Sequence, residues 1–182
     1  MAYIPVEEGV PGIRSLVIFR PETGRHLYDL AQVLLRGESP IPEAERELIA
    51  AYTSSKNNCK FCMMSHAAAS RELYGDKREI VDCVIEDIDK AGISPKLRAL
   101  LNIAAKVAKN GKEVTPGDIE AARNEGAVDR EIHDTVLIAA TFCMYNRYVD
   151  GLASFTPTDQ SDYDKMGIRL ATNGYVIPQN QN

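Results

Sequence analysis

Apolar residues recur at intervals of three and four along most of the chain, and proline, glycine or capping residues separate the successive runs. This period places apolar side chains on one face of an α-helix. The pattern predicts helices over about residues 21–37, 39–56, 59–74, 76–89, 94–109, 115–126, 129–152 and 160–171. Because strands do not alternate with these helices and the connections are short, we expect an all-α protein. The expected arrangement is an antiparallel bundle of about seven to eight helices.

The two ends of the chain lack this periodicity. Residues 1–20 are interrupted by prolines and glycines and predict an irregular segment, in which only the apolar run at 16–19 is compatible with a strand. Residues 174–182 predict a loose tail. A chain of 182 residues is an ordinary length for one domain, so we expect a single domain over residues 1–182.

Composition and charge narrow the class of protein. Hydrophobic residues make up 45% of the chain and charged residues 26%, as expected for a globular surface around a real core. The net charge of −5, without a basic cluster, argues against a nucleic-acid partner. The apolar runs are far shorter than the roughly 20 residues that span a bilayer, and the first residues do not resemble a signal peptide. We therefore expect a cytoplasmic protein that does not bind a membrane.

The segment 59–66, CKFCMMSH, places two cysteines and a histidine close together. One interpretation is a metal site, but structural zinc takes four ligands, and this segment offers only Cys59, Cys62 and His66. The other cysteines and histidines stand alone in the sequence, and we expect Cys83 and Cys143 to be core thiols. A buried helix start without chemistry is the second interpretation.

Redox chemistry is the third interpretation of this segment. Two cysteines separated by two residues in the first turn of a helix can close a disulfide with little motion. The free N–H groups and the positive end of the helix stabilise a thiolate there. A second thiol can then capture the sulfenic acid that forms when a thiolate attacks a peroxide. The thioredoxin fold, which also carries such a pair, needs strands that this sequence does not predict.

A histidine and a glutamate complete a possible proton relay. His66 follows Cys62 by four residues, so the two side chains share one helix face. Glu47 lies in the preceding predicted helix, which a short turn would fold back beside Cys59. A carboxylate, an imidazole and a thiol in series form an arrangement of nucleophile, base and orienting group.

The spacing of Glu47, Cys59, Cys62 and His66, with eleven, two and three residues between them, resembles a known signature. It is similar to that of the AhpD-like alkylhydroperoxidases, within the carboxymuconolactone decarboxylase superfamily. Residues 94–109, 133–153 and 169–175 resemble the "uncharacterized peroxidase-related" branch of that superfamily. The resemblance covers about residues 15–175.

This resemblance implies an all-α thiol peroxidase that needs no metal, haem or other cofactor. It implies that Cys62 attacks a hydroperoxide, that Cys59 resolves the sulfenic acid, and that His66 and Glu47 form the relay. A dithiol reductant, such as a lipoyl group, and a trimer or hexamer are also implied. Phe61 departs from the best-known members, which carry a second histidine at this position, so proton transfer and the reductant stay open.

Two other functions remain open from the sequence. A decarboxylase-like enzyme of the same superfamily needs a carboxylate-binding pocket and acid–base groups, but no cysteine pair. A redox-sensing protein without enzymatic activity would use the disulfide as a switch. Within the long helix at 129–152, His133, Asn146 and Asp150 are candidates either for lining the site or for structural roles.

Overall fold

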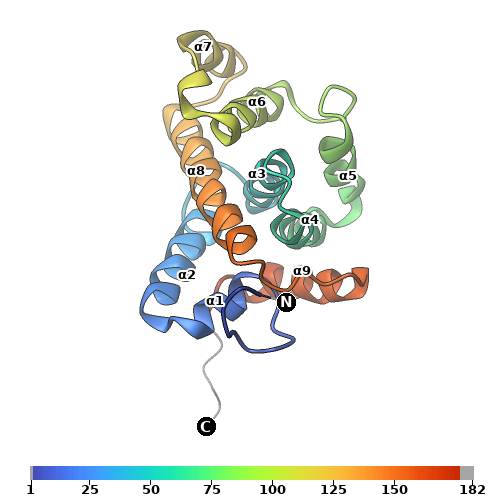
Figure 1. Cartoon of the computed structure of the whole chain (residues 1–182). Helices are drawn as coiled ribbons and strands as arrows, with labels where there is room; N and C mark the ends of the chain where they lie inside the picture. Colours follow the sequence, from blue (N-terminus) through green and yellow to red (C-terminus); the bar gives the residue numbers. More distant parts are fainter. Residues whose placement is uncertain (1, 177–182) are drawn as a thin grey trace.

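A computed structural model describes residues 2–176 and contains only helices and loops over that range (Figure 1). The all-α prediction is confirmed. Nine α-helices are present among the described residues, more than the seven to eight expected. Their bounds are α1 Ile13–Phe19, α2 Pro21–Arg36, α3 Glu43–Lys56, α4 Lys60–Tyr74, α5 Glu79–Glu86, α6 Pro95–Lys109, α7 Pro116–Asn124, α8 Asp129–Gly151 and α9 Gln160–Asn173. No helix among residues 2–176 has the length and apolarity needed to cross a membrane.

The extra helix is α1, in the N-terminal segment that we expected to be irregular. The apolar run at 16–19 is helical, so both the irregular segment and the strand option are wrong there. Three residues of α1 are buried, and the helix packs against α2 where Gly24 lies beneath Val17. A helix of seven residues has little intrinsic stability, so tertiary packing determines its conformation.

The expected loose tail is also wrong at its first residues. Gly174 ends α9 with a positive φ of 65°, and Tyr175 is then buried against the core. Glycine tolerates this left-handed conformation without steric cost. The other residues of the expected tail, 177–182, lie outside the described part of the chain.

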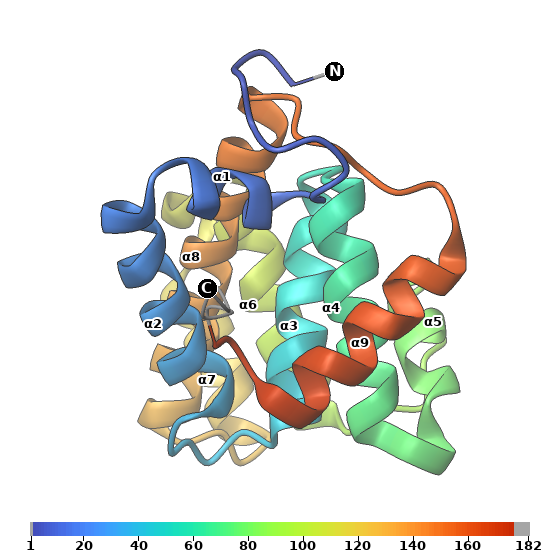
Figure 2. The same cartoon turned by 90° about the horizontal axis from the view of Figure 1, so that it is seen from below.

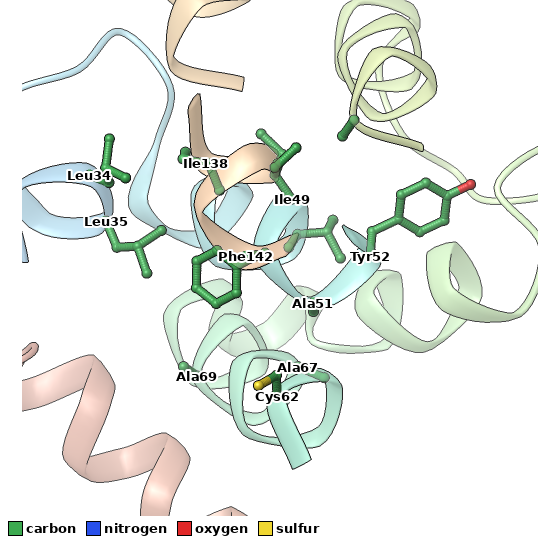
Figure 3. Close-up of a cluster of buried hydrophobic side chains, with 14 of the residues drawn as sticks. Leu34, Leu35, Ile49, Ala51, Tyr52, Cys62, Ala67, Ala69, Ile138 and Phe142 are labelled. Carbon is green, nitrogen blue, oxygen red and sulfur yellow. The ribbon is translucent and has the colours of Figure 1, made fainter. Parts of the chain in front are cut away.

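Helix α3 occupies the centre of the molecule, where it packs against α4, α6 and α8 (Figure 1). Residues 46–54 are buried without interruption, as expected for a helix that is enclosed on all sides. Figure 3 shows part of the core around it, with Ile49 and Ala51 of α3, Cys62 of α4 and Phe142 of α8. A central helix of this kind can bring a buried polar side chain to the middle of the protein.

Helix α9 crosses α4 obliquely rather than running antiparallel to it (Figure 2). The crossing point is Gly167, where an added Cβ would lie 2.7 Å from the backbone carbon of Ala68. Glycine and alanine therefore allow the two backbones to approach closely. This approach fixes the path of the chain that continues from α9 to Tyr175.

Candidate active site

The two cysteines of the predicted motif lie at the start of α4. Cys59 is the N-cap residue of this helix and Cys62 lies in its first turn. Asn58, with a positive φ of 58°, forms the tight turn that reverses the chain after α3. Both thiols are free and buried, with exposed fractions of 0% for Cys59 and 3% for Cys62.

The same reversal brings Glu47 of α3 beside His66 of α4. The Nδ1 atom of His66 lies 2.7 Å from Oε2 of Glu47, and both side chains are buried. A carboxylate can only accept a hydrogen bond, so Nδ1 of His66 carries the proton of this bond. Nε2 makes no hydrogen bond to the described residues. The structure thus brings together the glutamate and the histidine that the sequence spacing indicated.

Arg36 and Tyr175 complete this cluster, and the sequence reasoning missed both. Nη2 of Arg36 donates to Oε1 of Glu47 at 2.6 Å, and the Tyr175 hydroxyl donates to the same oxygen at 2.7 Å. The hydroxyl also lies 3.1 Å from Nδ1 of His66. Arg36 ends α2 and Tyr175 follows α9, so no local spacing connects them with Glu47. The only signal in the sequence for Tyr175 was the resemblance of residues 169–175 to the peroxidase-related branch.

This environment keeps Glu47 ionised. Burial raises the pKa of its carboxyl group, but the charges of His66 and Arg36 and the hydrogen bonds outweigh burial, so the pKa lies below its ordinary value. Burial and the negative charge of Glu47 raise the pKa of Tyr175 well above its usual value. Tyr175 is therefore a neutral phenol that can donate its hydrogen to the carboxylate.

The imidazole of His66 lies against two aromatic rings. The Phe142 ring meets it edge-on at a centroid distance of 4.4 Å, and the Tyr175 ring stacks nearly parallel to it at 6.0 Å. These contacts and the Glu47 hydrogen bond fix the orientation of the ring. A fixed imidazole is a better general base than a mobile one.

The thiol of Cys59 is difficult to ionise. A hydrogen bond with Cys62, then burial and the charge of Cys62, raise the pKa of Cys59, to which Asp150 adds a smaller effect. Among the described residues, no hydrogen bond joins Cys62 to His66.

A small apolar cavity of about 50 Å³ adjoins the cluster, and its lining includes Phe61, Ser65, His66, Phe142 and Tyr175. Such a space can hold a few water molecules or a peroxide group. Neither cysteine lines it. The ring of Phe61 stands between Tyr163 and Gly12, where any added Cβ would overlap it. The position that departs from the resembled family is therefore tightly enclosed.

The other polar candidates have different surroundings. Asn146 is buried and bonds Asn57 at 2.8 Å and Ser54 at 3.0 Å, so it ties α8 to the turn before Cys59. His133 contacts Asp134 near the start of α8 and makes no hydrogen bond to Glu47, His66, Arg36 or Tyr175. Cys83 is exposed, which corrects its assignment as a core thiol. Within residues 2–176, no three His, Cys, Asp or Glu side chains are placed to hold a metal ion.

Comparisons with known proteins agree on one group of relatives. The sequence model of the Carboxymuconolactone decarboxylase family matches residues 21–88, which include all four predicted site residues. No curated protein sequence matches the chain.

Solved structures extend this similarity over most of the chain. An uncharacterized peroxidase-related protein from Silicibacter sp. TM1040 is 29% identical with a TM-score of 0.76, covering 85% of this chain and 79% of that one. A second uncharacterized peroxidase-related protein, described as an alkylhydroperoxidase AhpD core and coming from Ralstonia eutropha JMP134, is 28% identical with a TM-score of 0.79. The match covers 91% of this chain and 96% of that one. A protein of unknown function from Agrobacterium tumefaciens shares the fold, with 20% identity and a TM-score of 0.69. The match covers 87% of this chain and 100% of that one.

Proposed function

We propose that the chain belongs to the AhpD-like carboxymuconolactone decarboxylase superfamily and is a thiol-dependent peroxidase that reduces alkyl hydroperoxides. The observation that carries the proposal is the buried Glu47–His66 hydrogen bond one helical turn from Cys62. A histidine oriented in this way beside a cysteine pair has the parts needed to generate and use a thiolate. The names of the structural relatives point to the same chemistry.

In the proposed reaction, Nε2 of His66 accepts the Cys62 proton through one water molecule. The Cys62 thiolate attacks the terminal peroxide oxygen, the O–O bond breaks, and the leaving alkoxide takes a proton to become an alcohol. Cys62 is then a sulfenic acid. The Cys59 thiol displaces its oxygen as water and forms the Cys59–Cys62 disulfide. The two thiols thus supply both electrons, and an external dithiol, for which a lipoyl group is suitable, returns them.

Substitution of Cys62 by serine tests the proposal. With a hydroperoxide and a dithiol such as dihydrolipoamide, Cys62→Ser should lose turnover completely, while Cys59→Ser should give one turnover and accumulate sulfenic acid. The matched control is Cys83→Ser, because Cys83 is exposed on α5 and outside the site. Stopped-flow measurement of peroxide loss and mass spectrometry of the 59–62 peptide distinguish these results. Full turnover by Cys62→Ser would contradict the proposal.

The family match also supports a decarboxylase-like function as the second candidate. Such a reaction needs no cysteine pair, so its activity would survive in the double variant Cys59→Ser/Cys62→Ser. A disulfide that cycles readily without any peroxide turnover would instead indicate a redox-sensing protein. We also propose a homo-oligomer, a trimer or hexamer, which light scattering of the purified protein would measure.

A further inference from the structure

Three cationic side chains, Arg14 of α1 and Lys165 and Arg169 of α9, line a surface depression of about 290 Å³. Asp162 is the one acidic residue among those that line it. In a chain with a net charge of −5, this is a local excess of positive charge. Arg14 and Arg169 also line the cavity beside His66, so the two arginines stand where that cavity meets the surface.

None of the three cations has an anionic partner within residues 2–176. The salt bridges and side-chain hydrogen bonds of this part of the chain do not involve Arg14, Lys165 or Arg169. Both arginines are partly buried. Burial, and to a smaller extent the positive charge of Arg14, lower the pKa of Arg169, so the two guanidinium groups repel each other. A bound anion would relieve this repulsion and accept hydrogen bonds from both groups.

A buried tyrosine gives a second, independent indication of a ligand. Tyr28 of α2 lines the same cavity as the two arginines, and only 7% of it is exposed. Its hydroxyl forms no hydrogen bond to residues 2–176. Burial raises the pKa of Tyr28, and the charges of Arg169 and Arg14 only partly offset this rise, so the hydroxyl is a neutral donor close to both guanidinium groups. A buried hydroxyl without a partner costs free energy unless a bound molecule accepts its hydrogen bond.

The charges in this region favour a phosphoryl group over a carboxylate. Two guanidinium groups and one ammonium group match the double negative charge and the several acceptor oxygens of a phosphate, whereas a carboxylate carries a single charge. The depression also has an apolar side, formed by the half-exposed ring of Phe155 with Pro11 and Pro157. The organic part of a phosphate ester can pack against this side.

We propose that the junction of the cavity and the depression is a binding site for a phosphoryl group, either of a small phosphate ester or of free phosphate. Arg14 and Arg169 donate hydrogen bonds to the phosphate oxygens, and the Tyr28 hydroxyl donates one more. Lys165 and Phe155 face the part of the ligand that lies in the depression. The ligand is bound and not transformed, so the site is independent of the cysteine pair and of the proposed peroxidase function.

Calorimetric titration with three small probes tests the chemical class of the ligand. Above about pH 7, phenyl phosphate and inorganic phosphate both carry nearly two negative charges, and benzoate keeps the ring of the ester with one carboxylate charge. We expect phenyl phosphate to bind at least about tenfold more tightly than benzoate. Tighter binding of phenyl phosphate than of inorganic phosphate would identify a phosphate ester as the ligand, and equal binding would identify free phosphate; both results support the site. Failure of both phosphates to bind, or equal binding of benzoate, would overturn it.

Matched variants test the location of this site. Arg14→Gln/Arg169→Gln should weaken phenyl phosphate binding at least about tenfold. The control Arg20→Gln/Lys112→Gln removes two exposed positive charges that line neither space, so its affinity should equal that of the native protein. Tyr28→Phe keeps the ring and removes one donor, so it should weaken binding several-fold even if the arginine double variant fails to fold, which circular dichroism checks. Native affinity in Tyr28→Phe or in the folded arginine variant, or an equal loss in the control, would overturn the site whatever the peroxide activity of the protein.

Discussion

Glu47 carries a negative charge inside a helix that is buried over nine consecutive residues. Three donors hold this charge: His66, Arg36 and Tyr175. The sequence predicted the first of them because Glu47 and His66 belong to two helices joined by a short turn, so their spacing carries geometric information. It could not predict the other two, because α2 and the residue after α9 reach Glu47 only through the tertiary packing of the whole chain.

Replacing Glu47 by glutamine should therefore weaken both activity and stability. An amide cannot hold the Nδ1 proton of His66 or offset the Arg36 charge as a carboxylate does, so we expect kcat/KM for hydroperoxide to fall by about 10²-fold. Glu45→Gln, which alters a neighbouring carboxylate of α3 outside the cluster, is the matched control. Equal turnover by the Glu47 and Glu45 variants would show that the relay plays no part in the reaction.

The lowered pKa of Glu47 also predicts the acid dependence of stability. A carboxyl group whose folded-state pKa lies below its unfolded value stabilises the protein fully above the unfolded value of about 4.3. This stabilisation is lost as the pH falls through the folded-state pKa. Urea unfolding at pH 7 and at successive values below 4 should therefore show the stability difference between native protein and Glu47→Gln narrowing toward low pH. A constant difference would contradict the ionised state of Glu47.

At the scale of elements, the helices with a strong apolar periodicity could be predicted from the sequence. The short helix α1 and the crossing of α9 over α4, which depend on tertiary packing, could not. Helices α6 and α8 follow runs of apolar residues bounded by capping signals, and the structure confirms them. Helix α1 has only seven residues, and its conformation depends on contacts with α2. The oblique crossing of α9 over α4 depends on the absence of a side chain at Gly167, and the apolar periodicity of the sequence carries no information about such a crossing.

Two glycine-to-alanine substitutions, one at the crossing and one away from it, test how much this crossing contributes to stability. In a helix interior, alanine is favoured over glycine by up to about 1 kcal/mol, and Gly151→Ala, at the last residue of α8, should show part of this gain because its added Cβ meets no atom within 4 Å. Gly167→Ala should instead lose about 1–3 kcal/mol, since its Cβ overlaps the α4 backbone. The free energy of unfolding in urea measures both changes. A gain at Gly167 would mean that α9 shifts without cost.

For the whole molecule, the candidate site joins parts of the chain that are far apart in sequence. Tyr175 lies 128 residues from Glu47, yet its hydroxyl reaches the carboxylate and its ring stacks on His66. Arg36 also lies over this ring, 5.4 Å from its centroid. The segment after α9 is therefore a structural part of the site, although its sequence predicted a loose tail.

Tyr175→Phe and Tyr175→Ala should separate the two contributions of this side chain. Phenylalanine keeps the ring against His66 but removes a hydrogen bond to buried Glu47, which should cost about 1–3 kcal/mol of stability. Alanine removes the ring as well, so it should destabilise further and reduce turnover more strongly than phenylalanine does. Thermal unfolding and kcat/KM, measured for both variants, give the comparison. Identical losses in the two variants would contradict a separate role for the ring.

The N-terminal segment, residues 3–12, covers the ring of Phe61 at Gly12, and this cover has a consequence for how reagents reach the thiols. The N-terminal segment is attached to the loop after α8 through backbone hydrogen bonds from Tyr3 to Leu152 and from Gly12 to Phe155. We expect these bonds to open without unfolding of the helices, so alkylation of the buried cysteines should follow local fluctuations and depend only weakly on urea. Gly12→Ala, which forces Phe61 to move, should accelerate iodoacetamide labelling and amide exchange at this segment while exchange in α3 stays slow. Labelling that appears only with global unfolding would show that the cover does not open in the native state.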